Sequence, residues 1–219
     1  MKSINYYQSV ITELKRSTDK NYANKNIEIT LLRLEAPLVN GQNSIAFPLV
    51  ETDNTFAPSQ TEKRLGNNEI FIPLELSLQH IVKDLLVEGS ELYALENTYI
   101  DPLQYVAAPG FTPAHLEVLY KGDLKFVRNN NVLIPQIPTS IFKFVPEQQA
   151  TGTAQSQRDS ESGYITLLNT KFIEGNSQNK ITFESKSFKF LSQWQYPIAA
   201  NKQVRLVLFL RGLKLTDKS

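Results

Sequence analysis

Residues 69–78 constrain the fold of this chain more than any other stretch. Their sequence, E-I-F-I-P-L-E-L-S-L, alternates apolar residues with a more mixed set. Side chains of an extended strand point alternately to two faces, whereas a helix would bring apolar residues together every three or four positions. The stretch therefore predicts a half-buried strand with Glu75 and Ser77 facing solvent or a neighbouring subunit. The residues predicted to share its apolar face are Ile70, Ile72, Leu74, Leu76 and Leu78.

Other segments show the same pattern. Residues 204–215 keep Val204, Leu206, Leu208 and Leu210 on one parity and then change parity at Gly212, which makes this glycine a candidate bulge. Apolar and charged residues flank Leu210 on both sides, so this strand is predicted to be covered on both faces. Further strands are predicted at 27–37, 44–50, 91–95, 103–106, 116–120, 123–127, 132–135, 141–145, 163–173 and 181–191, while 80–87 fits either a short helix or a strand.

The N-terminal segment has helical spacing instead. Apolar residues recur three and four apart from Ile4 to Leu14, and Ser3 is a candidate cap. Lys15, Arg16 and Lys20 lie near the helix end, where cations favour the helix dipole. One interpretation packs this helix on the sheet or on a neighbouring subunit. The other makes it an amphipathic arm whose basic end, Lys15, Arg16 and Lys20, touches a membrane or nucleic acid.

Many short strands separated by Gly, Pro and Asn predict an all-β fold of the jelly-roll type with an N-terminal helix. The favoured division is an N-terminal arm at 1–26, a first jelly roll at 27–120 and a second at 121–219. One elaborated barrel is the alternative. The polar segment 148–162 is predicted to be a long exposed loop.

Composition excludes several classes of protein. Of 219 residues, 41% are hydrophobic, and 23 basic residues face 22 acidic ones for a formal charge of +1. That balance disfavours a dedicated nucleic-acid binder. With no cysteine, disulfides and thiolate metal sites are excluded. Neither a signal peptide nor an apolar run of membrane-spanning length is present, so we expect a protein that is soluble when made.

Residues suited to chemistry are scarce. The only histidines, His80 and His115, lie far apart and without partners for zinc, and His80 is predicted to lie near the core. Neither a nucleophile elbow nor a phosphate-binding loop is present. The sequence therefore predicts no enzyme, no metal and no cofactor. Trp194 and Tyr196 leave one alternative open, a carbohydrate- or receptor-binding β-sandwich such as a spike or lectin-like module.

The order and spacing of four segments resemble those of a known protein family. The segments are 31–49, 61–72, 116–126 and 204–215. They include L-L-R-L-E-A-P-L-V-N-G, T-E-K-R-L-G-N-N-E and V-R-L-V-L-F-L-R-G. Together they resemble the major capsid proteins of small tailless icosahedral bacteriophages with an internal membrane, of the flavobacterial phage type in the double jelly-roll lineage. The resemblance covers most of the chain from residue 27 onward, although this chain is short for a double jelly roll.

The resemblance implies a virion structural protein, made in the host cytoplasm and assembled into the capsid. Its partners would be its own copies, as homotrimers forming pseudo-hexagonal capsomers, together with other virion proteins such as a penton or spike. Specific nucleic-acid binding is not implied. The N-terminal helix would face the internal membrane, with Lys15, Arg16 and Lys20 near the lipid headgroups.

Overall fold

The computed structural model describes residues 4–16, 22, 25–38, 44–54, 56, 58–94, 96–98, 119–129, 131–144, 163–167, 172–177, 179–185 and 201–218. Within these residues, nine strands form two antiparallel sheets, preceded by one α-helix, α1 (Ile4–Arg16). The predicted all-β fold with an N-terminal helix is thus confirmed.

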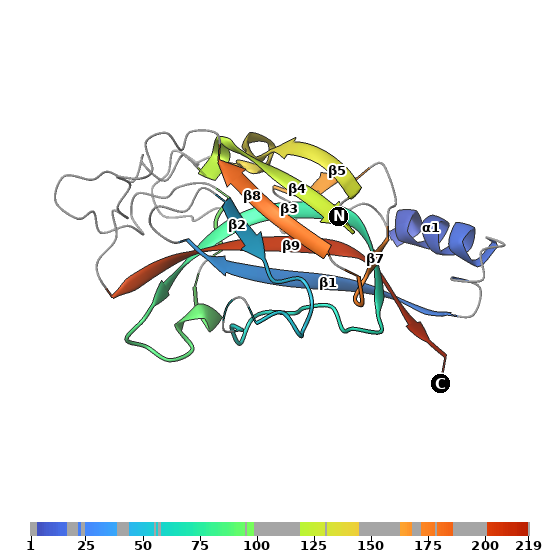
Figure 1. Cartoon of the computed structure of the whole chain (residues 1–219), viewed down its shortest axis with the longest axis horizontal. Helices are drawn as coiled ribbons and strands as arrows, with labels where there is room; N and C mark the ends of the chain where they lie inside the picture. The colour runs from blue at the N-terminus through green and yellow to red at the C-terminus, as the bar shows by residue number, and fades with distance from the viewer. Residues whose placement is uncertain are drawn as a thin grey trace, which may run out of the picture.

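The two sheets are stacked as the layers of a sandwich (Figure 1). The larger sheet has the order β1 (Lys25–Pro37), β9 (Lys202–Asp217), β3 (Ile70–Asp84), β6 (Ile165–Thr166), and β7 (Ile173–Glu174) also pairs with β3. The smaller sheet has the order β2 (Ser44–Phe47), β8 (Asn179–Ser185), β4 (Gly122–Arg128), β5 (Asn131–Pro138). Two 3-10 helices, η1 (Ser90–Leu92) and η4 (Thr139–Phe142), connect strands.

Strand β9 lies at the centre of the larger sheet, paired with β1 on one side and β3 on the other. Its even-numbered residues from Val204 to Leu210 belong to the core between the sheets. On its opposite face, Val207 and Phe209 are also buried, in a second cluster with Ile81. The prediction that this strand is covered on both faces is confirmed, because alternate residues on both parities have lost contact with water.

A bulge in β3 changes which residues share a face. Pro73 lies opposite Gly212 and Glu75 opposite Arg211, so Leu74 is an extra residue in β3. Ile72 and Leu74 consequently contact α1, whereas Leu76 and Leu78 contact the core between the sheets. The predicted single apolar face from Ile70 to Leu78 is therefore wrong, since one extra residue reverses the alternation.

The bulge also explains why residue 212 is a glycine. The sequence predicted a bulge at this residue, but the extra residue lies on the neighbouring strand, directly opposite. A Cβ on Gly212 would lie 2.0 Å from the carbonyl oxygen of Ile72. Only glycine permits this close approach of two backbones. Leu213 and Leu215 change cluster because α1 covers their face of the sheet.

Helix α1 covers one end of the outer face of the larger sheet (Figure 1). Tyr7 and Val10 are buried against Ile72, Leu74, Leu213 and Leu215. The interpretation of α1 as a helix packed on the sheet is confirmed for its apolar face. Its last turn carries Lys15 and Arg16, and both are exposed.

The predicted division into jelly rolls at 27–120 and 121–219 does not hold for the described strands. Strands β1 and β3 from the first range pair with β9 from the second, and β2 pairs with β8. Each sheet therefore mixes strands from both ranges, and the described strands form one sandwich. The alternation within each strand does not specify its partner, which is why the sequence left this open.

Two shorter predictions differ from the structure, and a third that was left open is decided by it. Of the two alternatives for 80–87, residues 80–84 take the strand, as part of β3, whereas the strand predicted at 91–95 begins within η1. The strand predicted at 141–145 coincides partly with η4. Both 3-10 helices place one large side chain inward and others outward, a local pattern that resembles strand alternation. The predicted strand at 103–106 lies outside the described residues, as do residues 116–118, 168–171 and 186–191 of three other predicted strands.

Candidate functional site

The structure gives the sequence-predicted residues different surroundings. Lys15 and Arg16 lie side by side at the exposed end of α1. Among the described residues, no helix is long and apolar enough to cross a membrane. Several other candidates lie outside the described residues: Lys20, His115, Trp194, Tyr196 and the whole loop at 151–162.

His80 is a buried residue of β3, with 1% of its surface exposed. Its Nδ1 lies 3.3 Å from the hydroxyl of Tyr120, and the two rings meet edge to face. The predicted position of His80 near the core is confirmed. A ring enclosed in this way contributes packing and a buried hydrogen bond to the sandwich.

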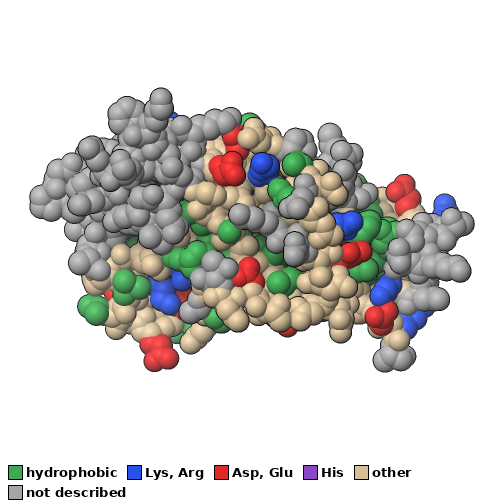
Figure 2. Space-filling view, in the orientation of Figure 1, with side chains coloured by type: hydrophobic (Ala, Val, Ile, Leu, Met, Phe, Trp, Pro, Cys, Tyr) green, Lys and Arg blue, Asp and Glu red, His purple; other side chains and the backbone are tan. Residues whose placement is uncertain are grey.

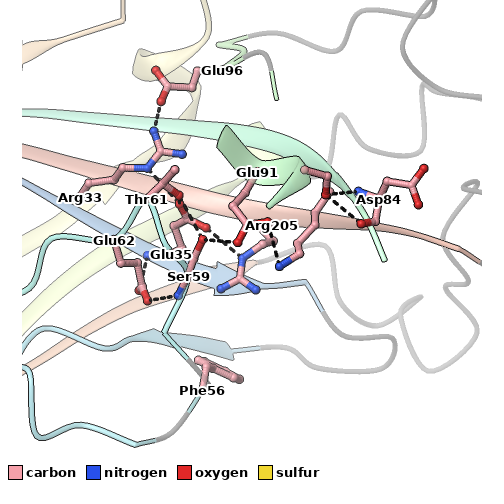
Figure 3. Close-up of polar contacts among 12 residues, drawn as sticks. Arg33, Glu35, Phe56, Ser59, Thr61, Glu62, Asp84, Glu91, Glu96 and Arg205 are labelled. Carbon is pink, nitrogen blue, oxygen red and sulfur yellow. Dashed lines mark hydrogen bonds and ion pairs between the residues drawn. The ribbon is translucent and has the colours of Figure 1, made fainter. Parts of the chain in front are cut away.

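A network of charged side chains lies on the outer face of the larger sheet, centred on Glu35 of β1 (Figure 3). One carboxylate oxygen of Glu35 accepts a hydrogen bond from Arg33 Nε at 2.9 Å and another from the hydroxyl of Thr61. Its second oxygen lies 3.1 Å from Arg205 Nε, an ion pair whose angle is outside hydrogen-bond geometry. The Glu35 side chain has no exposed surface. Arg33 also forms an ion pair with Glu96.

The loop before β3 joins this network through Glu62. Its carboxylate accepts hydrogen bonds from the backbone N–H of Glu35 and of Ser59, each at 2.9 Å. Arg64 lies 2.8 Å from the same carboxylate. Because Glu62 bonds to β1 and to its own loop at once, it fixes the loop along the edge of the larger sheet.

Glu91 lies in η1 and joins this 3-10 helix to β3 and to the loop at 58–65. Its carboxylate lies 3.0 Å from Lys83 Nζ and accepts a hydrogen bond from the hydroxyl of Ser59 at 3.3 Å. Burial by itself would raise the pKa of Glu91, but hydrogen bonds from backbone amides and from Lys83 outweigh burial and leave the pKa below its usual value. Glu91 is therefore a buried, ionised anchor.

The contacts of this network join segments that are distant in the sequence. Each of its carboxylates, on Glu35, Glu62, Glu91 and Glu96, lies against a cationic side chain. The adjoining surface hollow, about 250 Å³, is lined by Glu62, Lys63 and Arg64 together with Glu51 and Pro58. The described part of the chain contains no group of three or more metal-binding side chains. The network therefore fixes loop and 3-10 helix to the sheet.

Sequence reasoning missed this network. Its one local signal is the pair Arg33 and Glu35, which alternates with the apolar residues Leu32, Leu34 and Ala36 of β1. Charges at such positions normally face water. Here the loop at 58–65, which is distant in the sequence, covers them instead.

A second feature is an exposed group of large apolar side chains where β3 ends, which we call the apolar turn (residues 85–93). Figure 2 shows hydrophobic side chains gathered at this lower-left end of the molecule. Large exposed patches of this kind mark interaction surfaces, whereas isolated exposed apolar residues are ordinary. Its exposed members are Leu85 (53%), Leu86 (80%), Val87 (53%), Leu92 (53%) and Tyr93 (86%).

The backbone of the apolar turn is held by its own hydrogen bonds. The hydroxyl of Ser90 donates to the carbonyl of Asp84 at 2.8 Å and accepts from the Asp84 N–H at 3.0 Å. Gly89 adopts a left-handed conformation with φ of 71°, which a side chain would disfavour. The buried side chain of Glu91 holds η1 in place through Lys83 and Ser59. The exposed side chains are thus presented by a fixed backbone.

No family model matches this chain, and no match was found among curated proteins or among solved structures.

Proposed function

We propose that this chain is a structural subunit of a self-assembling protein shell of the viral capsid type, located in the virion. The observation that carries the proposal is the apolar turn. Burying one large apolar side chain gains about 1.5–3 kcal/mol, so a fixed group of five, Leu86 and Tyr93 foremost, favours contact with another protein surface. Asp84 borders the turn and Glu88 lies within it, and these acidic residues disfavour an anionic lipid surface as its partner.

The strand pairing supports the same proposal. If β6 and β7 are taken as two parts of one interrupted strand, the first strand pairs with the last, the second with the next to last, and so on to the β4–β5 pair. We infer that this nested pairing is a single jelly roll, an architecture used by capsid proteins and also by lectins. Fold alone does not choose between those functions, which is why the apolar turn carries the proposal.

One feature of the capsid resemblance needs adjustment. A six-sided capsomer made of three copies requires two barrels in each copy, whereas the described strands supply one sandwich per chain. We therefore propose the shell function with copies of this chain as the main partners, and leave the homotrimer as one outcome of the assembly experiment. Penton or spike proteins, and an internal membrane near Lys15 and Arg16, remain proposed partners.

Purified full-length protein tests the proposal by size-exclusion chromatography with light scattering, followed by negative-stain electron microscopy. We expect large particles or their capsomers from the wild type. The double variant Leu86→Ser/Tyr93→Ser should lose the large particles while unfolding as the wild type does, because both side chains are exposed in the single chain.

The matched control is Val132→Ser/Ile141→Ser, which removes two exposed apolar residues outside the apolar turn and should leave particle formation unchanged. A wild type that stays monomeric up to high concentration would overturn the shell proposal. Particles formed equally well by the Leu86→Ser/Tyr93→Ser variant would show that the apolar turn does not make the contact.

A further inference from the structure

A second inference concerns the outer edge of β1, which faces away from β9. Along its outer edge, Arg33 exchanges two backbone hydrogen bonds with Lys63, at 2.9 and 3.0 Å. The N–H of Glu35 also points outward, to the Glu62 carboxylate. The N–H and C=O groups of alternate residues point to the same edge, and β1 pairs with β9 without a register shift. The odd-numbered residues of β1 therefore direct their backbone groups away from β9.

Towards the start of β1, this edge has no strand partner among the described residues. Within the part of the chain that the structure describes, no backbone hydrogen bond reaches the outward groups of Ile27, Ile29 or Leu31. An open edge of this kind is a template for another strand. Proteins usually protect such edges with proline, a bulge or an outward lysine, and residues 27–31 contain none of these.

The side chains along this edge are suited to a partner. Ile29 has 47% of its surface exposed on the outer face of the larger sheet. Ile27 and Leu31, on the same face, are half-buried against the clusters on either side. Glu28 points to the opposite face, where its carboxylate lies 3.6 Å from Lys214 Nζ.

We propose that β1 of a second copy pairs with this edge, antiparallel, about a two-fold axis at Ile29. In that register Ile29 lies opposite Ile29 of the second copy, and Ile27 lies opposite Leu31 of the second copy. The outer face of the paired strands then becomes a continuous apolar row. On the other face Glu28 lies opposite Thr30. A register centred on Glu28 would set two carboxylates opposite each other, which disfavours it. The two larger sheets then form one continuous sheet across the dimer.

This contact goes beyond the proposed shell and does not depend on it. It uses the edge of β1 rather than the apolar turn, so the two contacts can be removed separately. In the Leu86→Ser/Tyr93→Ser background, which should lose the large particles, we expect sedimentation to show a dimer. Adding Ile29→Lys should abolish that dimer, because the new lysine lies opposite its own copy, without changing the unfolding transition.

The absence of cysteine allows a direct test of the register. In the full chain, Ile29→Cys should form a symmetric disulfide under mild oxidation, since directly paired residues have Cα atoms about 5.5 Å apart. Ile27→Cys is the matched control. It lies about 13 Å from its own copy in this register, because four residues separate their positions along the strands, and should not cross-link.

Cross-linking of both cysteine variants, or of neither, would overturn the register and the edge contact. A monomeric Leu86→Ser/Tyr93→Ser variant would show that the proposed dimer does not form, whatever the wild type assembles into. Conversely, a β1 dimer that forms without larger particles would support this inference and contradict the shell proposal.

Discussion

Glu35 shows at the scale of one residue how the outer face of the larger sheet is held. Its fully buried carboxylate lies between Arg33 and Arg205. We expect Glu35→Gln to lower the free energy of unfolding by about 3–5 kcal/mol, because it leaves buried arginine charge without a counter-ion. Arg205 should account for most of the loss, since Arg33 retains Glu96. Urea unfolding followed by circular dichroism measures the change.

Glu28→Gln is the matched control for Glu35→Gln. Its side chain is 64% exposed and its ion pair with Lys214 is partly in water, so we expect a change of about 1 kcal/mol or less. Similar losses from the two variants would contradict the role of burial in the Glu35 network.

At the scale of one element, α1 is attached to the sheet by a buried polar contact as well as by apolar packing. Tyr7 donates a hydrogen bond to Glu75 at 2.8 Å, and burial together with this carboxylate raises the pKa of Tyr7. Arg211 lies 3.9 Å from the same carboxylate and stacks on Tyr164. We expect Tyr7→Phe to destabilise the protein by about 1–3 kcal/mol, because a buried carboxylate loses a donor.

Hydrogen exchange should show which element loses stability in Tyr7→Phe. In Tyr7→Phe we expect the amides of α1 to exchange faster while those of β9 change little, because the helix is the element released. Tyr93→Phe removes a hydroxyl that is exposed and serves as the control, with no expected change in exchange or unfolding. Uniform acceleration over α1 and β9 would contradict a local attachment of the helix.

At the scale of the whole molecule, the two halves of the chain depend on each other. Strand β9 supplies the centre of a sheet whose other long strands, β1 and β3, come from the first half. Fragments 1–120 and 121–219 should therefore each lack a cooperative unfolding transition, and mixing them should be needed to restore β structure. Circular dichroism and thermal unfolding of each fragment measure this. A cooperative transition in fragment 121–219 alone would favour two separate barrels.

The strands and the site differ in how well the sequence predicts them. Alternation located β1, β3, β4 and β9, because a strand buried on one or both faces shows its own period. It failed at the bulge, although Pro73 within a central strand was a signal that the ladder is interrupted there. The Glu35 network could not be predicted, since Glu62, Glu91 and Arg205 reach it from three segments far apart in the chain.

The alternation at 69–78 and in segments such as 204–215 determined by itself that the chain is built mainly of strands, and the spacing before residue 16 determined the helix. These are local properties, set by the period with which side chains point towards and away from water. Tertiary structure alone decided that one sandwich forms, that Glu75 and Ser77 are buried, and which apolar residues stay exposed. Those outcomes depend on which segments, distant in the sequence, pack on a given face of the sheet. The local alternation of a strand does not indicate which segments these are.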